Sequence, residues 1–179
     1  ADAREAFESR LGWTFRERAV LRQALSHRSW CAEHPEDPSN ERLEFLGDAV
    51  LGIVVTDHIF RNYPQHQEGE LAKVRASVVN ADVLAEVAAD VALGPCLLLG
   101  KGEDGSGGRE KPSILADAME AVIAAVYLDG GMDAAWDVLA AVNFVESKFG
   151  KLRNASASGA QGPMQFMPAT WARYGLGGN

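Results

Sequence analysis

The sequence predicts an all-α protein, and two observations carry this prediction. Apolar residues recur at spacings of three and four along most of the chain, which is the period of an amphipathic helix. The alternation of apolar and polar residues that marks a half-buried strand is scarce. Because 47% of the 179 residues are apolar and 23% are charged, the composition is that of an ordinary folded domain with a sizeable core.

The first part of the chain is expected to hold three helices separated by polar breaks. Helical spacing covers about residues 2–13 and 16–30, and the stretch CAEHPEDPSN, with two prolines, then ends the pattern. Asn40 is the expected N-cap of the next helix. That helix should run over about residues 41–63 and stop before Pro64.

The middle of the chain is expected to continue with helices over residues 71–80 and 81–91. The glycine-rich stretch 94–112 is expected to break the helical pattern, with a flexible, exposed loop in its middle. Ser113 is the expected N-cap of a strongly apolar helix that reaches a pair of glycines. The two most apolar helices should therefore be the central ones.

The helical pattern resumes after these glycines as DAAWDVLAAVNFVESKFG and then gives way to a tail rich in Gly, Ala and Ser. We therefore divide the chain into a helical domain at 1–139 and a second part at 140–179 that is not an independent domain. No apolar run approaches the roughly 20 residues of a membrane span, and the first residues lack the apolar stretch of a signal peptide. We expect a soluble, cytoplasmic protein with two reduced cysteines and no membrane partner.

The net charge of −8 is unevenly distributed. Residues 140–179 contain four basic residues and one acidic residue, which gives +3 and leaves −11 for the rest of the chain. An acidic body repels polyanions, so a nucleic-acid partner would need bound cations or a basic patch to offset the repulsion.

Carboxylates recur at helical spacing inside the two most apolar segments. In NERLEFLGDAV, Glu44 and Asp48 fall within about 40° of each other on one helix face, and Glu41 sits nearly above Asp48. Asp117 and Glu120 repeat the spacing in the later helix. Because both helices should be central, we expect the acids to lie close together.

Like charges in an apolar setting repel and need a neutralising partner. The only nearby basic residue is Arg42, and the segment 113–130 contains no Lys or Arg. Oxygen-only ligands suit Mg²⁺ or Mn²⁺, and such ions assist phosphoryl chemistry. The spacing thus favours a divalent metal site, while solvated helix faces remain the alternative.

The segment NERLEFLGDAVLG resembles the signature of the ribonuclease III family. Three further segments resemble family motifs in the same order and spacing: LRQALSHRSW, EGELAKVRASVVN and ILADAMEAVIAAVYLDGG. The resemblance covers about residues 3–139, nearly the whole catalytic domain of that family. It implies an all-helical endonuclease domain that forms a homodimer and hydrolyses double-stranded RNA with Mg²⁺, for which Mn²⁺ could substitute.

The resemblance also implies roles for individual residues. The metal ligands would be Glu44, Asp48, Asp117 and Glu120. Asp48 and Glu120 would be the catalytic members of this set. Glu41 and Glu68 would be supporting acidic positions, involved in the site or in its subunit contact. His27 matches a family segment too, but a core or capping role is expected for it, since a metal-activated water needs no histidine base.

Three other positions match family contacts. Phe45 matches a dimer-contact position, against the alternative of a plain core phenylalanine. Ser77 and Asn80 match positions near the RNA backbone, against the alternative of ordinary polar residues on a helix surface.

Residues 140–179 resemble a different family, the soluble lytic transglycosylases, through a helix-borne Glu146 followed by GAQGPMQFMPATW. Glu146 matches the general acid of that family, but only about 40 residues of such a fold are present, so it would be vestigial. This favours a chimera in which a grafted helix and an irregular tail stand where a double-stranded-RNA-binding domain would follow. The leading function is a double-stranded-RNA endonuclease; the alternatives are a folded but inactive engineered chimera and, remotely, a lysozyme-like peptidoglycan lyase.

Overall fold

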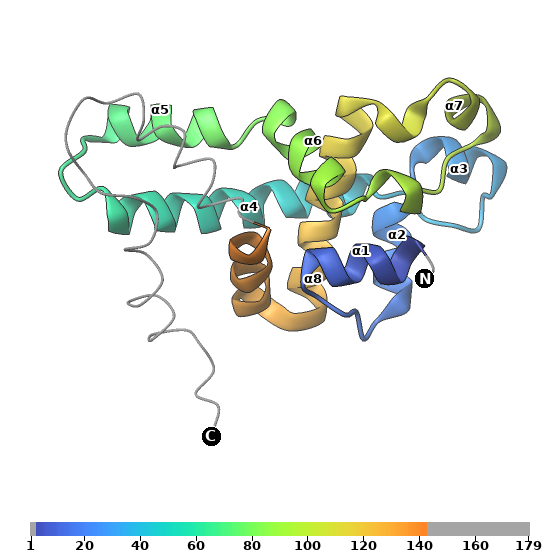
Figure 1. The fold of residues 1–179 in the computed structure, drawn as a ribbon, viewed down its shortest axis with the longest axis horizontal. Helices are drawn as coiled ribbons and strands as arrows, with labels where there is room; N and C mark the ends of the chain where they lie inside the picture. The colour runs from blue at the N-terminus through green and yellow to red at the C-terminus, as the bar shows by residue number, and fades with distance from the viewer. Residues whose placement is uncertain (1–2, 143–179) are drawn as a thin grey trace.

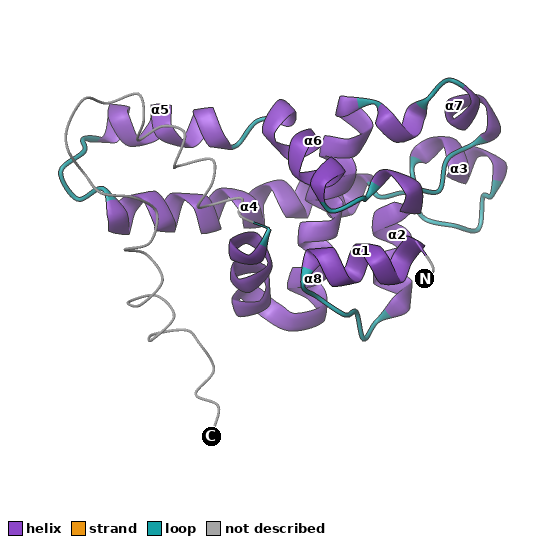
Figure 2. Ribbon diagram, in the orientation of Figure 1, coloured by secondary structure: helices purple, strands orange, loops and turns teal. Residues whose placement is uncertain are grey.

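Helices make up nearly all of the regular structure in the part of the chain that the computed structural model describes, residues 3–142 (Figure 1). In chain order they are α1 (Ala3–Leu11), α2 (Arg18–Leu25), α3 (Arg28–Glu33), α4 (Glu41–Asn62), α5 (Glu68–Val78), α6 (Ala81–Asp90), the 3₁₀ helix η1 (Gly94–Cys96), α7 (Lys101–Gly105), the 3₁₀ helix η2 (Gly108–Glu110) and α8 (Pro112–Ala141). Within this range there is no strand, and an isolated bridge joins Ser26 to Leu98 (Figure 2). The predicted all-α class is confirmed.

Helix α8 is the centre of the fold and packs against α2, α4 and α6. Half of its 30 residues are buried, and most of these are alanine, valine, leucine or isoleucine. Burial of this apolar surface is the main term that holds the helices together. Gly131 has φ of 83°, so the helix breaks there and then resumes to Ala141, as the glycine pair predicts.

Helices α4 and α5 form an arm that extends from the rest of the molecule (Figure 1). They contact each other, and α5 buries only Val78 among its 11 residues. Helix α5 begins three residues earlier than predicted, because the backbone N–H of Gln67 donates to the Glu70 carboxylate at 2.9 Å and fixes the first turn.

One long predicted helix, over residues 16–30, is in fact two. The chain leaves helix α2 at Ser26 because this segment pairs with residues far along the sequence. The backbone N–H of His27 donates to the Leu98 carbonyl at 3.1 Å, and that of Leu98 donates to the Leu25 carbonyl at 2.9 Å. Helix α3 then occupies part of the stretch that was predicted to be a break.

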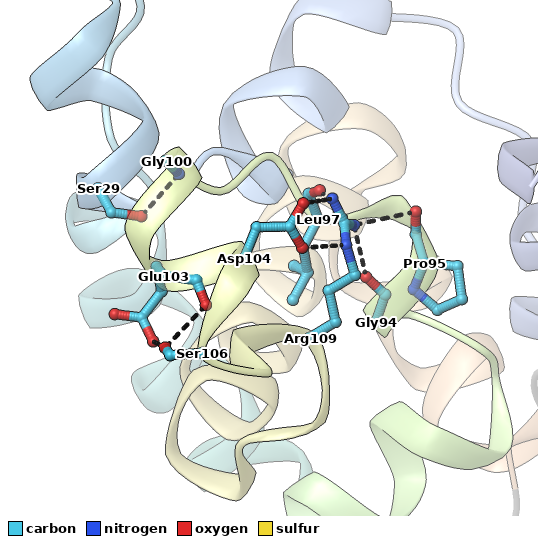
Figure 3. A network of polar contacts seen from close by, with 9 residues as sticks. All are labelled: Ser29, Gly94, Pro95, Leu97, Gly100, Glu103, Asp104, Ser106 and Arg109. Atoms are coloured by element: carbon cyan, nitrogen blue, oxygen red, sulfur yellow. Dashed lines mark hydrogen bonds and ion pairs between the residues drawn. The ribbon is translucent and has the colours of Figure 1, made fainter.

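The glycine-rich stretch 94–112 is exposed in its middle, as predicted, but this middle begins with helix α7 (Lys101–Gly105) and is not a flexible loop. Arg109 holds it together: its guanidinium is paired with Asp104 at 2.7 Å and donates to the carbonyl oxygens of Gly94, Pro95 and Leu97 at 3.2, 3.3 and 2.8 Å (Figure 3). The backbone N–H of Gly100 donates to Ser29 Oγ at 2.9 Å, which fastens the stretch to helix α3.

Two predicted helix caps differ from the structure. Helix α8 begins at Pro112 with Lys111 as its N-cap, because proline fits the first helical position, so the expected cap at Ser113 is wrong. Asn40 does precede helix α4, but its side chain does not cap the helix; its amide donates to the Ala24 carbonyl at 3.4 Å. The predicted continuation of the last helix and the tail, including Glu146, lie outside the described residues.

Asp129 ties helix α8 to the turn before helix α2. Its buried carboxylate accepts hydrogen bonds from Trp13 Nε1 at 3.0 Å and from the backbone N–H groups of Arg16 and Glu17 at 3.2 and 2.9 Å. We expect Asp129→Ala to lower the free energy of unfolding by about 2–4 kcal/mol, since several donors lose their acceptor. Urea denaturation checks this, with Asp133→Ala, an exposed acid on the same helix, as the control. A loss no larger than that of Asp133→Ala would contradict the assigned role.

Candidate metal centre

Three carboxylates from two helices meet at the crossing of α4 and α8. Glu44, Asp117 and Glu120 each offer one oxygen, and these oxygens all lie within 4.8 Å of one another. Glu44 stands in the first turn of α4, while Asp117 and Glu120 stand one turn apart on α8. Glu44 and Glu120 are half-buried, and Asp117 is exposed. We call these three side chains the carboxylate cluster.

Asp48 and Glu41 flank the carboxylate cluster without joining it. Both are exposed on helix α4. The charge of Asp48 helps to raise the pKa of Glu120, and the charge of Glu41 helps to raise the pKa of Glu44. Glu41 is also hydrogen-bonded, since Ser39 Oγ donates to its carboxylate at 2.9 Å.

All three members of the cluster sit where negative charge is disfavoured. Burial raises the pKa of Glu120 to about 7, and the charges of Asp48, Glu44 and Asp117 add to the effect. Burial also raises the pKa of Glu44, with contributions from Asp117 and Glu41. Asp117 is exposed as a whole residue, but partial burial of its carboxylate raises its pKa, and the charges of His27 and Arg28 lower it to a smaller extent.

No cation in the described part of the chain forms an ion pair with the cluster. The six ion pairs between side chains of residues 3–142 all use other acids. His27 does not fill this role, because burial lowers its pKa, and its Nδ1 accepts from the backbone N–H of Ser29 at 3.2 Å as the cap of α3. The predicted capping role of His27 is confirmed.

The donor set fits a hard divalent cation. It offers only carboxylate oxygens, which Mg²⁺ and Mn²⁺ prefer, and no sulfur or imidazole ligand that would favour a softer metal. A bound cation would also stabilise the ionised forms of these partly buried acids, whose raised pKa values come mainly from burial and, for Glu44 and Glu120, also from neighbouring acids.

Glu68 lies far from the carboxylate cluster within one chain, and its supporting role at the site or at a subunit contact stays a prediction. It is the first residue of α5, which follows the far end of α4 (Figure 1). Helix α4 has 22 residues and is therefore about 33 Å long, with Glu44 near its other end. The sequence does not reveal this separation, because a motif gives the order of its residues but not its distance from another motif in the folded chain.

Ser77 and Asn80 lie where α5 passes into α6, and both already have local partners. Ser77 Oγ donates to the Val74 carbonyl at 2.7 Å. Asn80 Oδ1 accepts from the backbone N–H of Val83 at 3.1 Å, so Asn80 caps α6. The cap was missed at the level of sequence, although Asn before a helical run is a standard signal for it. Their contact with RNA stays a prediction.

Phe45 projects from α4 into solvent. Its exposed fraction is 83%, so the alternative of a core phenylalanine is wrong. Ile53 and Phe60 are 58% and 69% exposed and lie within about 80° of Phe45 around the helix. We call these three side chains the exposed α4 face. A row of large exposed apolar side chains is typical of an interaction surface.

Comparison with known proteins gives consistent results along the chain. A family model described as ribonuclease-III-like matches residues 17–146. Ribonuclease 3 of Streptomyces coelicolor is 55% identical over 139 residues, covering 78% of this chain and 50% of the relative. Ribonuclease 3 of Syntrophobacter fumaroxidans is 41% identical over 179 residues, covering 98% of this chain and 74% of the relative. The chain thus spans half the length of the Streptomyces relative.

A solved structure agrees with the fold. The nuclease domain of ribonuclease III from Campylobacter jejuni is 40% identical and superposes with a TM-score of 0.73 over 81% of this chain and 97% of that one. It is described as showing structural flexibility in a region involved in dimer formation. These comparisons give no support to the transglycosylase likeness of residues 140–179 or to a chimera. Between residues 3 and 142, no helix is both long and apolar enough to cross a membrane.

Proposed function

Because the chain belongs to the ribonuclease III family, we propose that it is an endoribonuclease that hydrolyses double-stranded RNA with the help of a divalent cation. The observation that carries the proposal is the convergence of Glu44, Asp117 and Glu120 within 4.8 Å, with no ion-pair partner among the described residues. The names of the relatives support the reaction class.

The cluster and Asp48 would hold the cation. Bound Mg²⁺, or Mn²⁺ in its place, would supply an activated water and neutralise charge on the phosphodiester. The chain's own part is to present the carboxylates as anions, and Glu120 must lose its proton to do so. The charge of Asp48 helps to raise the pKa of Glu120. Asp48 itself is exposed, so substrate can reach its side chain from solvent.

A cleavage assay tests the proposal. Long duplex RNA is incubated at low salt with the protein and either Mg²⁺ or a chelator, because an acidic chain of net charge −8 should hold RNA weakly. We expect cleavage in Mg²⁺ that stops with chelator and returns when metal is restored, with 5′-phosphate and 3′-hydroxyl ends. Single-stranded RNA of the same sequence is the control. Absence of metal-dependent cleavage at micromolar protein would reject the proposal.

We also propose that two copies of the chain associate through the exposed α4 face and act in the cytoplasm. Three large apolar side chains on one helix face are costly to leave in water. The Campylobacter relative, described as having a region involved in dimer formation, supports association. Cys31 and Cys96 form no disulfide, which fits a reducing compartment.

Divalent metal is expected to stabilise the protein, more strongly at about pH 8 than at about pH 6. The pKa of Glu120 is raised in the fold, so the metal-free protein loses stability as the pH rises through about 7 and Glu120 ionises. Mg²⁺ relieves this repulsion, whereas protons compete with it at lower pH.

Thermal unfolding with and without Mg²⁺ at both pH values measures the effect, and we expect a rise of several degrees at the higher pH. His58, whose burial lowers its pKa to about 4, destabilises the protein in acid, but it does so equally with and without metal. A Mg²⁺ effect that is absent, or equal at the two pH values, would mean that the acids are merely solvated.

A further inference from the structure

The backbones of α4 and α8 touch at Gly47. A Cβ atom built on Gly47 would lie 1.8 Å from the carbonyl oxygen of Glu120, 2.5 Å from its carbonyl carbon and 3.1 Å from its Cα. Real Cβ contacts are essentially never shorter than 3.0 Å. The obstructing atoms belong to the backbone of the central helix, so they cannot rotate away as a side chain would.

This contact lies in the middle of the metal centre. On α4, Glu44 stands one turn before Gly47 and Asp48 follows it directly. On α8, Glu120 is the residue that is touched, and Asp117 stands one turn before it. Every side chain assigned to the cation is therefore within one helical turn of a single backbone contact.

Local backbone conformation does not explain the glycine. Gly47 lies inside α4 and is not among the described glycines with positive φ. Glycine in a helix interior costs about 1 kcal/mol relative to alanine, so intrinsic preference favours alanine here. Close approach of α8 is the remaining reason for glycine. Gly52, in the same helix, has no atom within 4 Å of the position that a Cβ would take, and it shows what a glycine without this constraint looks like.

We propose that Gly47 is a positioning residue of the metal centre, because it lets α4 rest on the backbone of Glu120 and so sets the spacing between Glu44 and the two carboxylates of α8. The inference rests on the proposed function only in taking the cluster as a cation site. A methyl group at Gly47 must move the helices apart until the 1.8 Å contact reaches at least 3.0 Å. Mg²⁺ demands nearly ideal octahedral geometry with short bonds, so a shift of about 1 Å in its ligands is poorly tolerated.

The matched pair Gly47→Ala and Gly52→Ala tests the inference. Both variants add one methyl group to α4, and circular dichroism first identifies a temperature at which each is folded. Melting temperatures measured against Mg²⁺ alone and Mn²⁺ alone then give half-saturating metal concentrations without any need for RNA. Cleavage of duplex RNA at saturating metal gives kcat separately.

For Gly47→Ala we expect the half-saturating Mg²⁺ concentration to rise at least about tenfold and kcat to fall about 100-fold. The half-saturating Mn²⁺ concentration should rise less, since the larger ion tolerates a wider site. Gly52→Ala should match the wild type in both metals. Because Gly52 lies within about 20° of Phe45 around α4, sedimentation velocity first confirms that this variant associates as the wild type does. A folded Gly47→Ala variant with wild-type half-saturating metal concentrations would overturn the inference. Loss of stability alone cannot imitate the expected result, because it does not change the metal preference of the folded molecules.

A second variant decides the matter if Gly47→Ala does not fold. Glu44→Asp shortens the α4 ligand by one methylene and leaves the Gly47 contact intact. If that contact fixes the spacing, α4 and α8 cannot move closer to compensate for the shorter side chain. The half-saturating Mg²⁺ concentration then rises at least about tenfold. Wild-type half-saturation in Glu44→Asp would show that the helices adjust freely and would overturn the inference. Wild-type protein that binds Mg²⁺ without cleaving RNA would count against the proposed function but not against this role of Gly47.

Discussion

Glu120→Gln is expected to reduce metal-dependent RNA cleavage by at least about 1,000-fold and to make the metal-free protein more stable. The amide is nearly isosteric with the carboxylate but carries no charge, so it is a poor ligand for a hard cation. The same change removes the half-buried acid whose pKa is about 7, and with it the repulsion from Glu44 and Asp117. Allowing for solvent screening, the gain in the free energy of unfolding at about pH 8 is about 1–2 kcal/mol.

Opposite effects on activity and stability distinguish this result from simple damage to the fold. Single-turnover cleavage and urea denaturation of the same samples measure the two quantities. Glu110→Gln, which removes an exposed acid outside the cluster, is the control and should change neither. If Glu120→Gln cleaved at the wild-type rate, or lost stability in metal-free buffer, the assignment of Glu120 to the cation would be wrong.

Phe45→Asp is expected to convert a dimer into a monomer, with the dissociation constant raised at least about 100-fold. Phe45 is 83% exposed in a single chain, and the exposed α4 face continues through Ile53 and Phe60. A carboxylate within an apolar interface would be buried without a partner, which costs several kcal/mol. Sedimentation velocity over a range of protein concentrations measures the change.

Leu128→Asp is the matched control for Phe45→Asp. Leu128 is also a large exposed apolar residue, with an exposed fraction of 54%, but it belongs to α8 and not to the exposed α4 face. The same substitution there should leave the dimer intact. A dimer that survives Phe45→Asp, or one that Leu128→Asp breaks, would place the interface elsewhere.

Local patterns predicted those parts of the fold that local interactions determine. Helix α4 could be read from its apolar spacing and from Pro64 after its end, and α6 was placed to within one residue. The acids of the cluster could be named because their spacing within each helix is local, and the central position of α4 and α8 follows from their apolar content.

Contacts between distant residues explain what the sequence did not reveal. The break at Ser26 depends on pairing with Leu98, and the ordered stretch 94–112 depends on the carbonyl oxygens that converge on Arg109. The sequence does not show why position 47 is glycine, because the reason is the close contact with the Glu120 backbone on α8. Glu68 was grouped with the site by its motif, although α4 separates the two within one chain.

The central claim is that Glu44, Asp117 and Glu120 together bind a divalent cation, and Mn²⁺ with anomalous X-ray diffraction tests it most directly. Crystals of the wild-type protein and of Glu120→Gln are soaked in the same Mn²⁺ solution, since Mn²⁺ shares the oxygen ligands of Mg²⁺ and gives an anomalous signal. We predict a peak bonded to oxygens of all three carboxylates in the wild type and a much weaker one in the variant. No peak at saturating Mn²⁺, or a peak away from these side chains, would contradict the account.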